Sequence, residues 1–168
     1  MKLLFHSPVG LLLAEYDPEA LRSLRFWRVG EHPPAGTRDE PARDDRMGQR
    51  ILRELGEYFA GGRHDFDLPL QPAATPFQET VREALRRIPY GEVRTYGELA
   101  RNVGRPGAAR AIGQANACNP YPIVVPCHRV VASGGRLGGY MGDWGEGEGV
   151  AIKRWLLGLE GKSLELRP

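Results

Sequence analysis

The chain has little cysteine: Cys118 and Cys127 are the two among 168 residues. Two cysteines are too few for the disulfide framework of a small secreted protein, and without an export signal they predict free thiols in a reducing compartment. Of the four histidines, only His128 adjoins a cysteine, and no second pair of ligands with zinc spacing accompanies it. We therefore expect no metal site.

Long hydrophobic runs are also missing. No apolar stretch approaches the roughly 20 residues of a membrane span, so no membrane partner is expected. Pro8 and Gly10 interrupt the apolar residues of the start, and no small-residue cleavage site follows, so the start predicts a pair of strands rather than a signal peptide. These features predict a cytoplasmic location, associated with the nucleoid if the source is prokaryotic.

The chain lacks a large excess of charge of either sign, since its formal net charge is +2. The charge is unevenly placed, however. Residues 1–70 hold 10 basic and 12 acidic side chains, a net of −2, whereas residues 71–168 hold 13 and 9, a net of +4. This asymmetry permits a nucleic-acid face on the C-terminal part, and an ordinary solvated basic surface is the alternative.

Residues 1–70 predict a small α/β domain. Helical spacing of apolar residues from Ile51 to Phe59 predicts one helix, which Gly61-Gly62 ends, and residues 30–46 resemble a loop. Apolar runs bounded by turn residues predict strands over residues 3–6, 11–15 and 21–27, with a further short strand over 66–70.

Residues 71–74 resemble a linker, and residues 75–168 predict a mainly helical domain. Two capping boxes, Thr75–Gln78 and Thr95–Glu98, begin helices. A tight turn at 105–107 then leads into a helix over 108–117, which together form a helix-turn-helix arrangement. Residues 123–125 predict a buried strand. The last helix has apolar positions at Val150, Ile152, Trp155, Leu156 and Leu159 and ends at Gly161.

Cys127 is the first candidate for chemistry. A thiolate is the nucleophilic form, so such a site must favour loss of the thiol proton, and His128 is adjacent in sequence. Adjacent strand residues point to opposite faces, so a bridging water is one route for that proton. A buried structural cysteine is the alternative, because free cysteine is among the most buried residue types.

Glu160 stands at the C-terminal end of the last helix, where the helix dipole disfavours an anion. One hypothesis is that Glu160 orients a histidine, and the other is that it is a surface glutamate without a role.

The helix over 108–117 is rich in small residues, with Arg110 among them. It is either a recognition helix for DNA or a packing helix with a solvated arginine. Its small residues are Ala108, Ala109, Ala111, Gly113 and Ala115.

The stretch Asn119–Val130, NPYPIVVPCHRV, resembles the active-site signature of the O6-alkylguanine-DNA alkyltransferases. The resemblance extends to residues 77–100, to the helix at 108–113 and to residues 155–161, and it is looser in residues 1–70. It implies a ribonuclease-H-like N-terminal domain and a C-terminal domain with a winged helix-turn-helix. It also implies cofactor-free, single-turnover repair of O6-alkylguanine in double-stranded DNA by a monomer.

The resemblance assigns roles to individual residues. Cys127 would accept the alkyl group, His128 would take its proton through a water, and Glu160 would hold His128. Tyr96 would hydrogen-bond the flipped guanine, and Arg110, on the DNA-binding helix with its small residues, would fill the gap in the stack. Asn119 would brace the turn before the active strand. Backbone around Val130 and Met141, and the ring of Tyr140, would line the pocket.

Three departures from the family pattern stand out. Arg82 replaces a usual tryptophan, Met141 replaces a small residue, and the glycine-rich loop over 142–149 is longer than usual. Three other functions compete with repair. They are non-catalytic lesion binding, which the presence of Cys127 opposes, transcription regulation through the helix-turn-helix, and hydrolysis by a catalytic cysteine.

Overall fold

The computed structural model describes residues 1–27, 30, 32–142 and 147–162 of the chain. The chain divides into two compact units, Met1–Pro72 and Ala73–Pro168, which we call the N-terminal and C-terminal units. Both α-helices and β-strands are present, so the fold is of the mixed α/β type. None of the described helices is both long and apolar enough to cross a membrane.

A four-stranded sheet forms one layer of the N-terminal unit, in the order β3-β2-β1-β4. Strands β1 (Lys2–Ser7), β2 (Gly10–Tyr16) and β3 (Leu21–Trp27) are antiparallel, which confirms the three strands expected there. β4 (Thr37–Arg38) pairs parallel to β1 inside the stretch predicted as a loop. The short strand expected at 66–70 is wrong, because its pairing is one bridge between Leu21 and Leu70.

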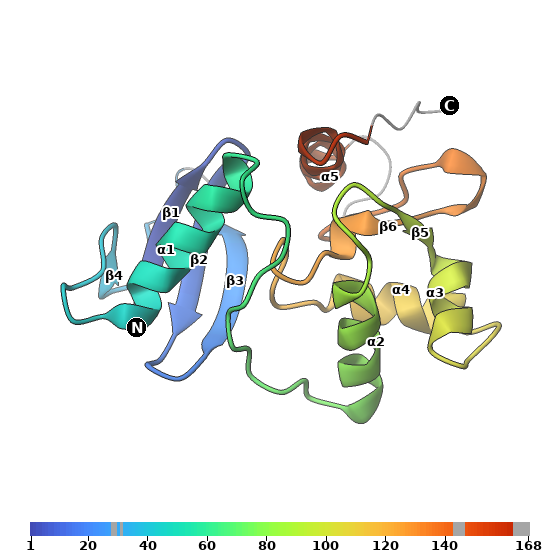
Figure 1. The fold of residues 1–168 in the computed structure, drawn as a ribbon, viewed down its shortest axis with the longest axis horizontal. Coiled ribbons are helices and arrows are strands. Elements are labelled where there is room, and N and C mark those ends of the chain that lie inside the picture. Colours follow the sequence, from blue (N-terminus) through green and yellow to red (C-terminus); the bar gives the residue numbers. More distant parts are fainter. Residues whose placement is uncertain (28–29, 31, 143–146, 163–168) are drawn as a thin grey trace. The chain divides into compact units, whose positions relative to one another are not determined.

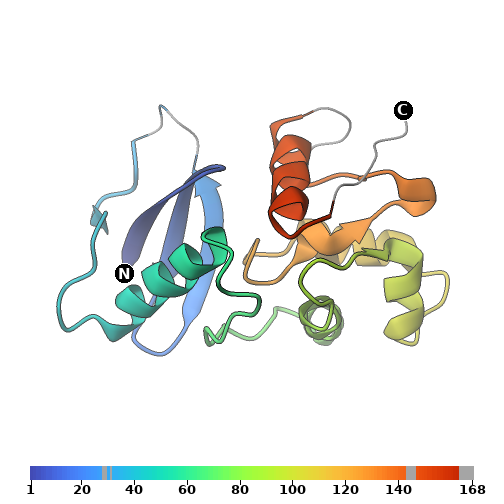
Figure 2. The same ribbon diagram turned by 45° about the horizontal axis from the view of Figure 1, so that its top comes forward.

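Helix α1 (Arg46–Phe59) lies against one face of this sheet, as Figures 1 and 2 both show. The ring of Phe59 stacks on Phe5 of β1 at 5.8 Å, and Tyr58 packs against Phe66 at 5.4 Å. Asp45 caps the helix by accepting a hydrogen bond from the backbone N–H of Gly48. The helix therefore begins five residues earlier than its first predicted apolar position, Ile51.

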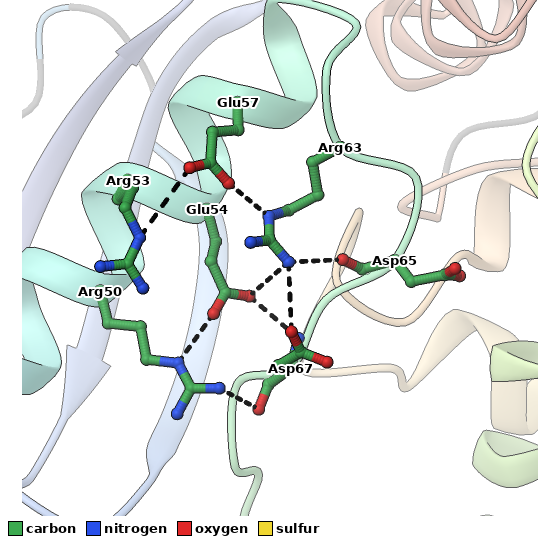
Figure 3. A network of polar contacts seen from close by, with 7 residues as sticks. All are labelled: Arg50, Arg53, Glu54, Glu57, Arg63, Asp65 and Asp67. Carbon is green, nitrogen blue, oxygen red and sulfur yellow. Dashed lines mark hydrogen bonds and ion pairs between the residues drawn. The ribbon is translucent and has the colours of Figure 1, made fainter.

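A polar network fastens α1 to the segment that follows it (Figure 3). Glu54 is 1% exposed, and its carboxylate accepts a hydrogen bond from Arg50 at 2.7 Å. It also accepts one from the backbone N–H of Asp67 at 2.9 Å and forms an ion pair with Arg63 at 3.6 Å. Arg63 in turn donates to Glu57 at 2.7 Å. One buried carboxylate thus binds both the backbone of Asp67 and the side chain of Arg63.

Three helices form one side of the C-terminal unit: α2 (Pro76–Arg86), α3 (Tyr96–Asn102) and α4 (Ala109–Ala117). Thr75 and Thr95 cap α2 and α3, and the capping box of α3 is complete, with Glu98 accepting from the backbone N–H of Thr95. The box predicted for α2 is half formed, since Gln78 supplies the N–H that Thr75 accepts. A turn over residues 103–108 joins α3 to α4.

The other side of this unit consists of short elements and α5. Strands β5 (Arg94–Thr95) and β6 (Val130–Val131) pair in parallel, and two 3₁₀ turns, η1 (Cys127–Arg129) and η2 (Ser133–Gly135), flank β6. Helix α5 (Glu148–Leu159) packs beside η1. Its end at Gly161 is confirmed, because Gly161 has a φ of 77° and Lys162 N–H returns to the carbonyl of Leu157.

The strand predicted at 123–125 is wrong. These residues are buried, as expected, but they form a turn in which Val125 N–H donates to the carbonyl of Tyr121 at 2.8 Å. Ile123 has a φ of 75°, in the left-handed region where a β-branched residue is strained. Prolines at 120, 122 and 126 remove the N–H groups that a strand ladder needs, so the chain turns here instead.

Candidate active site

Cys127 is buried at the first position of η1, with 4% of its surface exposed. Its carbonyl accepts a hydrogen bond from Asn116 Nδ2 on α4 at 3.3 Å. Burial raises the pKa of the thiol, while hydrogen bonds with Asn119 and Tyr140 and the positive charge of Lys153 oppose that rise. Burial therefore favours the neutral thiol, whereas Asn119, Tyr140 and Lys153 favour its anion.

His128 and Glu160 come together as the sequence hypothesis for Glu160 expected. The imidazole Nε2 lies 2.8 Å from Glu160 Oε1, and both side chains are buried. Because Cys127 and His128 occupy a 3₁₀ turn, the opposite-face argument for adjacent strand residues does not apply to them. Glu160 is the C-cap of α5, so the helix end places the carboxylate inside the unit rather than on its surface.

Glu160 also holds Arg129, which the sequence analysis had given no role. The guanidinium donates to both carboxylate oxygens, at 2.9 and 3.0 Å, and Gly91 N–H donates to Oε2 at 3.2 Å. Burial alone would raise the pKa of Glu160. Hydrogen bonds from His128 and Arg129, together with the positive charge of Arg129, outweigh burial and hold that pKa at about 2, so the carboxylate is ionised at neutral pH.

Lys153 is a second buried cation that sequence reasoning missed. Its side chain is fully buried, and Nζ donates to the carbonyls of Val130 at 2.6 Å, Leu137 at 2.7 Å and Gly139 at 3.2 Å. Burial lowers its pKa to about 8, and the charge of Cys127 opposes that shift. The ammonium is therefore still the major form at neutral pH, and its three carbonyl acceptors favour that form.

Tyr96, the first residue of α3, is half-buried near the cysteine. Burial raises its pKa, a hydrogen bond with Asn116 opposes the rise, and the charge of Cys127 adds to it. The ring fits between two glycines, since a Cβ at Gly113 of α4 or at Gly138 would lie 3.9 or 3.4 Å from ring carbons. The small residue at 113 thus packs against Tyr96.

Asn119 joins the two ends of the turn that precedes the cysteine. Its Nδ2 donates to the carbonyl of Val125 at 3.0 Å, and its Oδ1 accepts from Tyr121 N–H at 3.1 Å.

The remaining predicted pocket residues differ in how far they are exposed to solvent. Val130 and Tyr140 are buried, whereas Met141 is 45% exposed with a φ of 54°.

The predicted DNA-binding residues lie on or just before α4. Arg110 and Ala111 are exposed, and Ala108 and Ala109 are half-buried. The opposite face of the helix carries the buried Ile112 and Asn116. Among the described residues, no group of three or more His, Cys, Asp or Glu side chains is arranged to hold a metal.

Most of the C-terminal unit matches the model of a known protein family. Residues 76–162 match the family model described as the DNA-binding domain of 6-O-methylguanine DNA methyltransferase. The chain belongs to this family. The matched range holds every residue of the candidate site, from Tyr96 on α3 to Glu160 at the end of α5.

Relatives and solved structures agree with the family model. A methylated-DNA–protein-cysteine methyltransferase from Methanosarcina acetivorans is 42% identical, over 94% of this chain and 96% of its own length. One from Mycolicibacterium paratuberculosis is 46% identical, over 92% and 88%. The crystal structure of Mycobacterium tuberculosis OGT in complex with DNA is similar with a TM-score of 0.78 and 40% identity, over 95% of this chain and 91% of that one.

The structure shows the surroundings of two helix residues that the sequence analysis named, Arg82 and Trp155. Arg82, which the resemblance marked as a departure from the family pattern, is 12% exposed on α2, pairs with Glu79 and lies over the ring of Tyr121 at 5.8 Å. Trp155, predicted at an apolar position of α5, is 38% exposed, whereas Lys153 on the same helix is buried. Residues 143–146 of the glycine-rich loop lie outside the described residues.

Proposed function

We propose that the chain repairs O6-alkylguanine in double-stranded DNA by irreversible transfer of the alkyl group to Cys127. The observation that carries this proposal is a buried cysteine whose neighbour in the same turn, His128, is held 2.8 Å from a buried carboxylate. Membership of the 6-O-methylguanine DNA methyltransferase family and the likeness to a DNA-bound relative support it.

The chemistry proposed for this site is a displacement at carbon. Cys127 loses its proton to His128 through an intervening water, and Glu160 holds the imidazole. The thiolate attacks the alkyl carbon, the bond between that carbon and guanine O6 breaks, and its electron pair stays on the guanine. Tyr96 hydrogen-bonds the base as charge develops there. No step returns the thioether to a thiol, so each molecule acts once and needs no cofactor.

The DNA-binding face that we propose is the exposed side of α4. The target base lies inside the duplex, so the nucleotide must be extruded, which costs roughly a few kcal/mol. Arg110 fills the gap, and the small side chains of Ala108, Ala109, Ala111 and Gly113 let the helix approach the duplex closely. The α3–turn–α4 pair with β5 and β6 serves as a winged helix-turn-helix, and the N-terminal unit is ribonuclease-H-like.

The pocket for the flipped guanine is proposed around Cys127, where Asn119 braces the preceding turn. The backbone at Val130 and Met141 contacts the guanine edge, and Tyr140 lines the wall. We propose that the chain works as a monomer in the compartment that holds DNA. Non-catalytic lesion binding, operator binding and hydrolysis by Cys127 are the competing functions.

One experiment separates these functions. The protein is mixed with a duplex containing one O6-methylguanine, and its intact mass is measured. We expect a gain of one methyl group per molecule in the parent and in Cys118→Ser, and none in Cys127→Ser. Binding of the lesion without mass gain would support a lesion-binding protein, and repeated turnover would support a hydrolase. Preference for one undamaged sequence would support a regulator.

A further inference from the structure

Arg129 lies inside the candidate site, yet the mechanism proposed above gives it no task. Its guanidinium is 3% exposed and is saturated with acceptors, since Nη1 donates to the carbonyl of Ile88 at 2.6 Å while Nε and Nη2 hold Glu160. It also lies over the ring of Tyr90 at 5.7 Å. An arginine does not lose its proton in a protein, so a permanent positive charge is fixed against the carboxylate that faces His128.

The net charge of these buried groups determines the protonation state of His128. With Arg129 present, the ionised Glu160 is already balanced, and an uncharged imidazole leaves the three groups neutral. A protonated His128 would add an unbalanced charge to a site where Lys153 already supplies one. Without Arg129, the same carboxylate would be balanced by an imidazolium instead, because a buried carboxylate requires a partner of opposite charge.

The distinction matters for proton transfer. In an uncharged imidazole whose Nε2–H donates to Glu160, Nδ1 is the ring nitrogen that can accept the proton of Cys127. In an imidazolium both nitrogens carry protons, so the ring cannot act as a base. A lone carboxylate beside a buried histidine would therefore hold the base in its inactive form at neutral pH.

We infer that Arg129 is a positioning residue that keeps His128 uncharged by supplying the counter-charge for Glu160. The directions of the shifts agree: burial lowers the pKa of His128, Glu160 opposes this, and the charges of Arg129 and Lys153 add to the lowering. Arg129 belongs to η1, Lys153 to α5 and Glu160 to the C-cap of α5. Tyr90, a titratable residue in the segment after α2, lies beside Arg129. The consequence for transfer rests on the proposed function.

The direct test follows the imidazole by NMR titration in the absence of DNA. In the parent, the signal of His128 should show an uncharged imidazole throughout the neutral range. In Arg129→Met, the signal of His128 should show protonation throughout the neutral range. Titration of His128 at the same pH in the parent and in Arg129→Met would overturn the inference.

A double variant that removes both charges keeps the inference testable if Arg129→Met alone does not fold. Arg129→Met combined with Glu160→Gln removes both charges, so His128 should again remain uncharged in the neutral range. Arg129→Lys keeps the charge and should behave as the parent. If Arg129→Met does not fold, protonation of His128 in the double variant would by itself contradict the charge argument.

The rate of methyl transfer gives an independent measurement. In Arg129→Met, the single-turnover rate at about pH 6 should fall roughly tenfold more than the rate at about pH 9, because the imidazole must first lose its extra proton. A purely structural role for Arg129 predicts an equal loss at every pH. Absence of transfer in the parent would refute the proposed function while leaving the imidazole titration interpretable.

Discussion

Glu160 shows at the scale of one residue how the site is coupled to stability. Its pKa is held at about 2, below the ordinary 4.5, chiefly because His128 and Arg129 outweigh the effect of burial. A depressed folded-state pKa contributes stability above the unfolded-state value, and that contribution is lost as the pH falls from about 4.5 to about 2. The site therefore stabilises the folded chain only while the carboxylate is ionised.

We predict that the stability difference between the parent and Glu160→Gln shrinks by roughly 3 kcal/mol between pH 6 and pH 2. The parent loses the contribution of this carboxylate over that range, whereas the variant has none to lose. Urea unfolding at several pH values measures the difference. Glu83→Gln, a change at an exposed position of α2, is the control and should leave the pH dependence as in the parent. A constant difference would contradict the prediction.

Packing of whole elements depends on a few buried polar groups, and Glu54 of α1 is one that can be tested. We predict that Glu54→Gln lowers the free energy of unfolding by about 3 kcal/mol, because Arg50 and Arg63 lose their buried counter-charge. Glu57→Gln, at a side chain 42% exposed on the same helix, is the matched control and should cost at most about 1 kcal/mol. Similar losses in urea denaturation would contradict this role for Glu54.

The exposed face of α4 gives a second test at this scale. Ala111→Glu should weaken binding to duplex DNA about tenfold, since its charge would face the phosphates, while thermal stability stays near that of the parent. Ala151→Glu adds the same charge at an exposed position of α5 and is the control. Fluorescence anisotropy with a labelled duplex measures both affinities. Equal affinities of the two variants would exclude this face of α4 from the DNA contact.

At the scale of elements, the sequence could predict mainly the features that depend on residues close together in the chain. The caps at Thr75 and Thr95 and the glycine at 161 act within a few residues, so the helix limits near them followed from the chain. The turn at 121–125 could not be predicted from the sequence, because isoleucine rarely adopts the left-handed conformation that Ile123 has here. The burial of Lys153 could not be predicted either, since its carbonyl acceptors come from segments distant in sequence.

At the scale of the whole molecule, the candidate site lies within one unit. Every residue of the candidate site belongs to residues 73–168, which also hold the net charge of +4 counted over 71–168. The motif around Cys127 could be identified from sequence because its residues are consecutive. The charge arrangement of Arg129, Glu160 and Lys153 could not, because it depends on α5 packing beside η1.

The burial of Cys127 has a consequence for the whole molecule after the reaction. Cys127 is 4% exposed, so an alkyl group added to its sulfur has to be accommodated among packed neighbours, including Asn119 and Tyr140. Inserting carbon into a packed interior costs about 1–3 kcal/mol. The alkylated protein should therefore unfold at a lower temperature than the unreacted one, and the cost should grow with the volume of the group.

We predict that reaction with O6-benzylguanine lowers the melting temperature more than reaction with DNA carrying O6-methylguanine. Differential scanning calorimetry of each product, freed of DNA and with its mass checked, measures the order. Cys127→Ser treated with the same reagents is the control and should melt unchanged, because it carries no acceptor. An unchanged melting temperature in both alkylated products would mean that the pocket accommodates the group fully. In that case the space beside Cys127 is already as large as the substrate requires, and burial of the thiol imposes no packing cost on the product.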